Sequence, residues 1–387
     1  MHSRISPSWR IPALLFLALS FLTVDCPRLA ADEPGAGDRH LLYVAAPGIR
    51  DYLQFGGAGI LVFDMDHGHR FVKRISTPAS QLAKPENIKG VCASAATGRL
   101  YFTTLTKLYC LDLSTEKVLW DKALTGGCDR LAITPDGKLL YVPSLEGAHW
   151  HVVDAGSGAI VAKIEPNSGA HNTICSLDGS RVYLAGLRSR LLSVVDTRTQ
   201  KIVQTVGPFD GPIRPFTVSA AQTLCFVTVN DLLGFEVGDL KSGKMLHRVE
   251  VEHFRKGTPK RHGCPSHGVG LNPDETEIWV CDGANSHLHV FDATITPPRQ
   301  MASLKLREQP GWVTFSLDGR YAYPSTGEVV DTASKKILLG LADEQAREVH
   351  SEKMVEIVWR GDKVVKTGDQ FGVGRAKSTA GPGGAKK

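Results

Sequence analysis

Side chains that could bind a ligand or transfer a proton recur at one place in a repeated pattern of this 387-residue chain. When the copies are aligned on their turn residues, these side chains stand at the start of each copy's first apolar run. The set is Asp129, Arg130, His171, Asn172, Arg214, His267, Trp312 and His350. Imidazole, guanidinium, amide and carboxylate groups that converge in one place favour binding of a polar or anionic molecule. We therefore treat these residues as the candidate ligand-binding site.

The same residues leave a metal site open as an alternative. His171, His267 and His350 could supply three imidazoles, with a carboxylate from Asp129 or Glu352, which is an acceptable donor set for zinc or copper. Nothing in the spacing requires a metal, because the donors lie in separate copies of the repeat. No cofactor is predicted.

The repeat that positions these residues occurs seven times, at a spacing of about 40 residues, and each copy reads as four short strands. The clearest copies are residues 130–164 and 172–206. Each has an apolar strand, an Asp-Gly turn, a strand that ends in an aromatic residue and Val or Leu, a strand that ends in Val-Val-Asp, and a fourth apolar strand. One such unit cannot bury both of its faces, so the copies must pack on one another. The pattern predicts an all-β fold, a seven-bladed β-propeller of four-stranded antiparallel blades.

The two ends of the repeat region complement each other. Residues 40–46 align with a second strand that lacks a first strand before it, and residues 353–359 align with a first strand. Pairing of these N- and C-terminal strands would close the ring and remove open sheet edges. We expect the propeller to span residues 38–368 and residues 376–387, rich in Gly, Ala and Lys, to be a disordered tail.

The first 31 residues have the features of a secretory signal peptide. Arg4 and Arg10 precede an apolar run at 11–24, and the small residues Ala30 and Ala31 follow it. The run is too short to span a bilayer comfortably, so we expect cleavage, no stable membrane anchor, and a secreted or periplasmic protein. Without these residues the net charge falls from +5 to +3, which is too small to imply nucleic-acid binding by itself. We expect a monomer.

The repeats resemble those of the YVTN-repeat propellers, which include the YncE-like periplasmic proteins. The resemblance covers residues 39–366 and rests mainly on residues 135–142 (PDGKLLYV) with Val152-Val153-Asp154. No copy carries the full Tyr-Val-Thr-Asn tetrad. The resemblance implies the propeller architecture and leaves the activity open, since this architecture hosts binding proteins, lactonases and oxidases. Its repeats often carry Pro-His-Gly before the inner strand, so His171 and His267 also have a purely structural interpretation.

Two loops are longer than a connection requires, at residues 47–59 and 252–267. The second is basic, and the first offers Tyr52 and Phe55 for stacking. In a propeller both loops would open onto the face that carries the candidate site, here called the top face. We expect this face to bind an anionic small molecule, a glycan, single-stranded nucleic acid or a protein partner. A solvated charged surface with no partner is the alternative.

The second functional hypothesis is a propeller-type lactonase that hydrolyses a sugar-acid lactone. The resemblance to propeller lactonases implies Glu, Arg and His around the channel, and Arg214 and His267 could polarise the carbonyl and act as general base. The glutamate has no clear match, because Glu86 and Glu352 fall in loops. The chain has no GxSxG, P-loop or HExxH motif.

Seven scattered cysteines follow the signal region, and none form a CxxC pair. Cys175 and Cys225 fall on apolar strand positions and read as small buried side chains. Cys264 and Cys281 lie near the same end of one expected strand pair and could form a disulfide.

Overall fold

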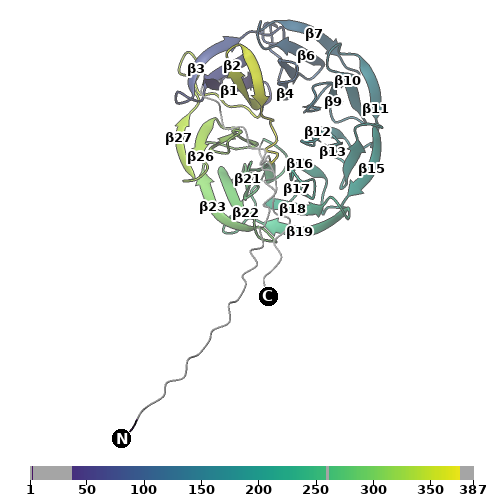
Figure 1. The fold of residues 1–387 in the computed structure, drawn as a ribbon, viewed down its shortest axis with the longest axis vertical. Coiled ribbons are helices and arrows are strands. Elements are labelled where there is room, and N and C mark those ends of the chain that lie inside the picture. Colours follow the sequence, from purple (N-terminus) through teal and green to yellow (C-terminus); the bar gives the residue numbers. More distant parts are fainter. Residues whose placement is uncertain (1, 3–36, 259–260, 375–387) are drawn as a thin grey trace. The chain divides into compact units, whose positions relative to one another are not determined.

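The computed structural model describes residues 37–258 and 261–374, together with residue 2. Regular structure in these residues is β-strand throughout, arranged as seven antiparallel sheets in a ring (Figure 1). The prediction of an all-β, seven-bladed propeller is therefore confirmed. The expected signal peptide and C-terminal tail lie outside the described residues. The described part of the chain contains no helix with the length and apolar character needed to cross a membrane.

Six of the sheets hold four consecutive strands each. The first of these contains β4 (Gly90–Ser94), β5 (Arg99–Thr103), β6 (Lys107–Asp112) and β7 (Val118–Ala123). The next contains β8 (Ala132–Ile133), β9 (Leu139–Pro143), β10 (Trp150–Asp154) and β11 (Ile160–Ile164). The third contains β12 (Ala170–Cys175), β13 (Arg181–Gly186), β14 (Leu192–Asp196) and β15 (Lys201–Val206).

The remaining three continue the pattern around the ring. One contains β16 (Ile213–Val218), β17 (Leu224–Val229), β18 (Gly234–Asp239) and β19 (Lys244–Glu250). The next contains β20 (Ser266–Leu271), β21 (Glu277–Asp282), β22 (His287–Asp292) and β23 (Arg299–Lys305). The last contains β24 (Val313–Phe315), β25 (Tyr321–Pro324), β26 (Glu328–Asp331) and β27 (Lys336–Gly340).

The seventh sheet joins the two ends of the chain. Its strand order is β29 (Lys363–Thr367), β28 (Met354–Arg360), β1 (Asp38–Ala46), β2 (Gly59–Asp64) and β3 (Arg70–Ile75). β1 pairs antiparallel with β28, with Tyr43 opposite Val355, so the ring closes as the sequence predicts. The sheet has one strand more than the repeat, because β29 pairs with the free side of β28.

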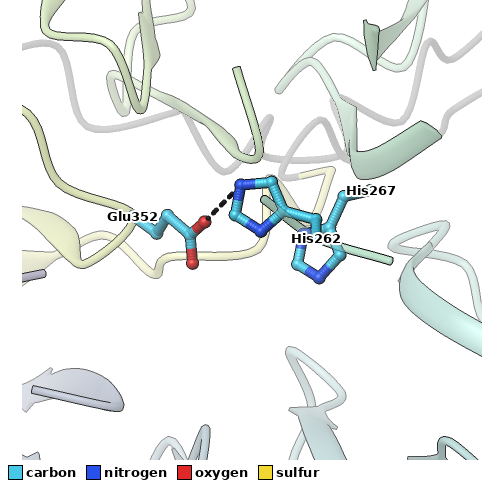
Figure 2. Close-up of side chains that lie close together, drawn as sticks. All are labelled: His262, His267 and Glu352. Atoms are coloured by element: carbon cyan, nitrogen blue, oxygen red, sulfur yellow. Dashed lines mark ion pairs between the residues drawn. The ribbon is translucent and has the colours of Figure 1, made fainter. Parts of the chain in front are cut away.

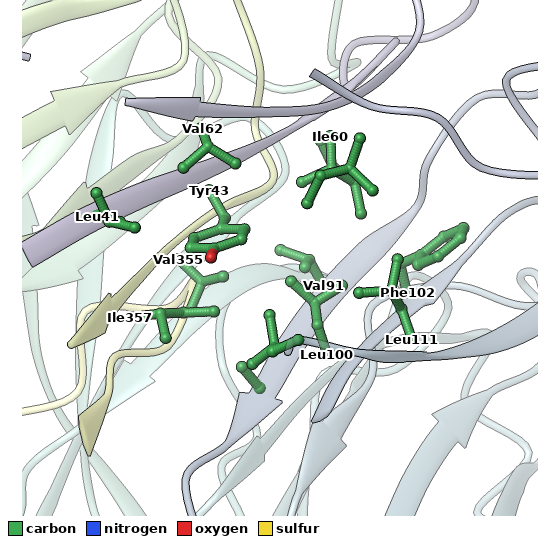
Figure 3. Packing of buried hydrophobic residues seen from close by; sticks show 14 of the residues in the cluster. Leu41, Tyr43, Ile60, Val62, Val91, Leu100, Phe102, Leu111, Val355 and Ile357 are labelled. Atoms are coloured by element: carbon green, nitrogen blue, oxygen red, sulfur yellow. The ribbon is translucent and has the colours of Figure 1, made fainter. Parts of the chain in front are cut away.

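Apolar side chains between neighbouring sheets hold the ring together. At the closing seam, Tyr43 and Val355 pack in one cluster with Val91 and Phe102 of the next sheet (Figure 3). Each of these four side chains is at most 2% exposed. Burial of a side chain of this size contributes about 1.5–3 kcal/mol, so this cluster stabilises the closed ring. Similar clusters join the other neighbouring sheets and hold the inner strands whose starts carry the candidate site.

The chain does not leave the ring at β29. The segment from Gly368 to Val373 crosses the inner strands, where the carbonyl of Gly372 accepts hydrogen bonds from Thr217 Oγ1 (2.8 Å) and from the Leu271 backbone N–H (3.0 Å). Phe371 and Val373 are 3% and 2% exposed. This channel segment (residues 368–373) reaches beyond the expected end of the propeller at residue 368.

The cysteines of the described residues are free thiols. The disulfide considered between Cys264 and Cys281 is not formed: the Cys264 thiol contacts the Ser266 carbonyl oxygen (3.1 Å), and Cys281 packs in an apolar cluster with Trp279. Cys225 is buried, as its apolar strand position predicts, whereas Cys175 is half-buried.

Candidate functional site

Asp129 and His171 form a buried pair at the entries of neighbouring inner strands. Asp129 lies just before β8 and His171 is the second residue of β12, and the carboxylate Oδ2 lies 2.6 Å from the imidazole Nδ1. Burial alone would raise the pKa of Asp129, but the facing His171 and Lys89, with Nζ 3.4 Å from Oδ1, lower it to about 2. Burial lowers the pKa of His171. A neutral His171 then donates its Nδ1–H to Asp129, which leaves Nε2 as a hydrogen-bond acceptor.

Arg130 and Glu352 form a second pair, one residue further along the chain from Asp129. The Arg130 guanidinium contacts the Glu352 carboxylate directly and lies over the Trp312 ring, 3.8 Å from its centroid. Lys353 Nζ donates to the same Glu352 oxygen, Oε2 (2.9 Å), and to the Gly48 carbonyl (2.7 Å). Burial opposes ionisation of Glu352, but Lys353, His262 and Arg130 hold its pKa well below the usual range. Burial, reinforced by the charge of Arg130, lowers the pKa of Lys353 to about 7.

Several polar atoms of this region are buried and make no hydrogen bond. They include Arg130 Nε and both side-chain amide atoms of Asn172, which is 1% exposed. Folded proteins leave few such atoms, because each costs about 1–3 kcal/mol. Such atoms occur elsewhere in the described residues too, for example at Tyr141 and Trp359, and those of Arg130 and Asn172 lie where the inner strands begin.

His262 and His267 stack on each other at the end of the long basic loop. Their ring centroids are 4.4 Å apart and their planes differ by 24°. His267 Nδ1 donates to the Gly311 carbonyl (2.8 Å), and a side chain on Gly311 would collide with the His262 ring. Burial lowers the pKa of His262 to about 4 and that of His267 well below its usual value. Glu352 Oε1 lies 3.2 Å from His262 Nε2 (Figure 2).

Two of the candidate residues are engaged elsewhere. Arg214, on β16, donates a hydrogen bond from Nε to Asn230 Oδ1 (2.6 Å), so its guanidinium is bound to a neighbouring loop. His350 is 1% exposed, stacks on Phe55 with centroids 4.0 Å apart, and lies 3.2 Å from a Glu348 oxygen. The structure thus brings five of the eight candidates into contact, namely Asp129, Arg130, His171, His267 and Trp312, and Asn172 follows His171 on β12.

The three-histidine metal set considered from the sequence is replaced by a different group. Among the described residues, the group of His, Cys, Asp or Glu side chains close enough to share a metal ion is His262, His267 and Glu352. His171 is instead bound to Asp129. Alignment of the repeats could not predict His262 as a site residue, because it lies in the long loop and has no counterpart in the other copies. In the sequence, only the unusual length of that loop marked the region as a candidate for function.

A cavity of about 230 Å³ lies along the channel near the same inner strands. It is lined by residues of β4, β8 and β12, the turns that follow them, and the channel segment. Its walls contain both polar and apolar side chains, among them Cys92, Thr134 and Gln370. The channel segment therefore borders an open space beside these inner strands.

The chain matches no protein-family model, and no curated protein matches it either. Among solved structures, a chain of Kuenenia stuttgartiensis hydrazine synthase is similar, with a TM-score of 0.43 and 14% sequence identity. The match covers 66% of this chain and 96% of that chain. A likeness this distant carries no information about activity.

Proposed function

We propose that this protein binds a small anionic molecule, such as a carboxylate, at the mouth of the propeller channel. The observation that carries this proposal is the set of buried polar atoms without partners, Arg130 Nε and the side-chain amide of Asn172. These atoms carry a desolvation penalty in the unliganded protein because they make no hydrogen bonds. A ligand that accepts a hydrogen bond from the guanidinium and bonds to the amide would offset that penalty.

The charge of the mouth supports an anion. Lys89, Arg130 and Lys353 stand against two carboxylates, those of Asp129 and Glu352. With Lys353 protonated, the cations exceed the anions by one, so a monoanion balances the site. Partly buried charges interact more strongly than charges in water, and such an imbalance favours uptake of a counter-charge.

The same geometry favours a small molecule over a glycan or a single-stranded nucleic acid. Polymers of that kind bind along exposed grooves with free aromatic rings. Here Phe55 stacks on His350, and Tyr52 lies under the Arg261 guanidinium, 5.5 Å from it, so both rings are occupied within the protein. Arg130 and Asn172 are 3% and 1% exposed, so neither presents the open surface along which a polymer binds.

The test replaces Asn172 with leucine. In the unliganded protein, Asn172→Leu removes two unsatisfied polar atoms at similar volume and raises the free energy of unfolding by about 1 kcal/mol. The variant also abolishes the thermal stabilisation by any small carboxylate or phosphate that a shift screen finds for the wild type.

The matched control is Asn272→Leu. The amide of this residue donates to Thr276 Oγ1 (3.0 Å) and accepts from the Glu277 N–H (2.8 Å). The substitution therefore lowers the free energy of unfolding by about 1–3 kcal/mol and leaves ligand binding intact. Wild-type affinity in Asn172→Leu would rule out the proposed site.

Hydrolysis of a lactone is the second candidate, and the Asp129–His171 pair favours it. A carboxylate that holds the imidazole through Nδ1 leaves Nε2 available as general base, as in other hydrolytic sites. Arg130, rather than Arg214, follows Asp129 directly in the chain, and its ion-pair partner Glu352 would take the role of the glutamate that the sequence left unmatched. A colorimetric panel of lactones tests this candidate. If the wild type hydrolyses a lactone and His171→Gln does not, hydrolysis is supported. If the wild type shows no more turnover than His171→Gln, hydrolysis at this site is excluded.

We also propose that the protein is exported and belongs with the YncE-like propellers. The apolar run at 11–24 with Ala30 and Ala31 supports export, and the repeat at 135–142 supports the grouping. N-terminal sequencing of the secreted or periplasmic fraction should find a chain that begins at Asp32. A mature chain that still begins at Met1 would contradict cleavage.

A further inference from the structure

Three potential metal ligands from separate segments meet at the channel mouth. His262 comes from the loop before β20, His267 is the second residue of β20, and Glu352 lies two residues before β28. One donor atom from each lies within 4.8 Å of the other two (Figure 2). Two imidazoles and one carboxylate form the donor set of many zinc sites that keep an open coordination position.

The hydrogen bond of His267 leaves one of its ring nitrogens free to bind a metal. The Gly311 carbonyl can only accept, so His267 Nδ1 carries the proton and Nε2 keeps its lone pair. A backbone carbonyl that fixes the tautomer in this way is the usual support of a metal-binding histidine.

The contact between His262 and Glu352 is more informative still. His262 Nε2 and Glu352 Oε1 are 3.2 Å apart, yet neither atom makes a hydrogen bond, and the Glu352 side chain is 5% exposed. Two ligand atoms that each lie about 2.0–2.2 Å from one zinc ion are separated by a distance of this order. With the proton of His262 on Nδ1, the two atoms face each other through lone pairs, and a cation between them offsets the resulting repulsion.

A small cavity adjoins the two histidines on the side away from Glu352. Its volume is about 10 Å³, and His262 and His267 line it together with Arg261, Cys264 and Gln309. That volume admits roughly one water-sized particle and excludes an organic ligand. Arg130 and Lys353 bind the other oxygen of Glu352, Oε2, so Oε1 remains available as a ligand while their charge limits the affinity for a cation.

We infer that His262, His267 and Glu352 bind a divalent transition-metal ion of the zinc class, with at least one coordination position left for water or an anion. This site shares the Glu352 carboxylate with the charge balance of the proposed function, but its ligand atoms differ from the Arg130 Nε and the Asn172 amide on which that function rests. Its test uses metal alone.

The experiment measures zinc retained by the mature protein. The wild type is stripped with a chelator, incubated with ZnCl₂, desalted and analysed for metal, and about one zinc ion per chain is expected. His262→Gln should lower the affinity by ~10-fold or more. The matched control is His253→Asn, since His253 lies in the same loop with its side chain 86% exposed and a left-handed backbone (φ 67°) that asparagine tolerates.

Cobalt(II) provides a second readout that needs no variant. Binding at a site with nitrogen ligands gives visible absorption bands that titrate to a stoichiometry of about one per chain. Thermal unfolding shows whether His262→Gln is folded, and Glu352→Gln serves as the second ligand variant. Wild-type protein that retains less than about 0.2 zinc per chain, or a folded His262→Gln that retains as much as the wild type, overturns the inference. Neither result bears on carboxylate binding by metal-free protein.

Discussion

His69 is a side chain whose chemistry is set by burial. It is 5% exposed, its Nε2 lies 2.9 Å from the Tyr323 hydroxyl, and burial lowers its pKa to about 4, although Asp64, Asp66 and Asp318 act in the opposite direction. Arg320 adds to the lowering. The imidazole is therefore neutral in the folded protein under conditions in which an unfolded histidine is charged.

This difference predicts a loss of stability in mild acid. Because the folded pKa lies below the unfolded value of about 6.5, the unfolded state binds the extra proton first, and the free energy of unfolding falls as the pH drops from about 6.5 towards 4. The contribution of one such group is at most about 1.4 kcal/mol per pH unit. His69→Asn should flatten the profile of denaturant midpoints over this range, whereas His67→Asn, at an exposed neighbour, should leave it unchanged. Parallel profiles for wild type and His69→Asn would contradict the assignment.

Single residues were predictable where they occupy repeat positions. Asp129 and His171 stand at the same point of adjacent copies, so aligned turns alone place them side by side, and the structure bonds them. Arg214 stands at that point too, but its long side chain turns to Asn230, which alignment cannot foresee. His262 lies in the long loop, outside the repeat, and its approach to His267 depends on how that loop folds back.

The turn between the third and fourth strands explains the recurring aspartate of each copy. Asp112 Oδ1 accepts from the backbone N–H groups of Ser114 (3.0 Å) and Thr115 (2.8 Å), and Asp154, Asp196 and Asp331 make the equivalent bond. The sequence shows this aspartate as a strand end, whereas its structural role is to hold the turn. In several copies the turn ends in a left-handed residue, which is Gly158 in one copy and Glu116 in another (φ 58°).

The left-handed position predicts a stabilising substitution. A non-glycine residue at positive φ carries backbone strain that glycine avoids, so Glu116→Gly should raise the free energy of unfolding by about 0.5–1 kcal/mol. Loss of the exposed contact with Lys73 makes this gain smaller. Gly158→Ala, the reverse change in the next copy, should lower it by a similar or larger amount. Denaturant unfolding of both variants provides the measurement. If Glu116→Gly destabilises the protein by as much as Gly158→Ala does, strain at this position is not the controlling factor.

These turn aspartates also predict how the ring responds to stronger acid. Hydrogen bonds from the turn lower the pKa of Asp112, Asp154, Asp196 and Asp331, chiefly through Ser114, Ser157, Thr199 and Ser334 respectively. A lowered acid pKa gives stability that is present above the unfolded value of about 3.9 and is lost as the pH falls through the folded values. Asp112→Asn should weaken the fall in midpoint between about pH 5 and 3, and Asp274→Asn, at an exposed position, should not. An unchanged slope in Asp112→Asn would show that the turn does not drive acid unfolding.

The closed ring could be predicted from the sequence because its two ends are complementary parts of one repeat. β1 lacks a first strand and β28 supplies it, so both the number of sheets and the seam follow from counting copies. β29 and the channel segment have no counterpart in the repeat, and nothing in their composition shows that they turn inward. Their position depends on contacts with inner strands from four different sheets: β4, β16, β20 and β24.

The channel segment therefore makes a prediction about the whole molecule. A chain that ends at Thr367 keeps every blade and the closing seam. It loses the buried side chains of Phe371 and Val373, and it loses the Gly372 carbonyl that accepts hydrogen bonds from Thr217 and Leu271. Two buried apolar side chains contribute on the order of 3–6 kcal/mol, so the truncated protein should unfold at a clearly lower denaturant concentration. A chain that ends at Gly374 keeps all of these contacts and is the control. Equal stability of the two chains would mean that the seven sheets support the channel without the segment, whereas the predicted difference would show that it braces the inner strands whose entries carry the site.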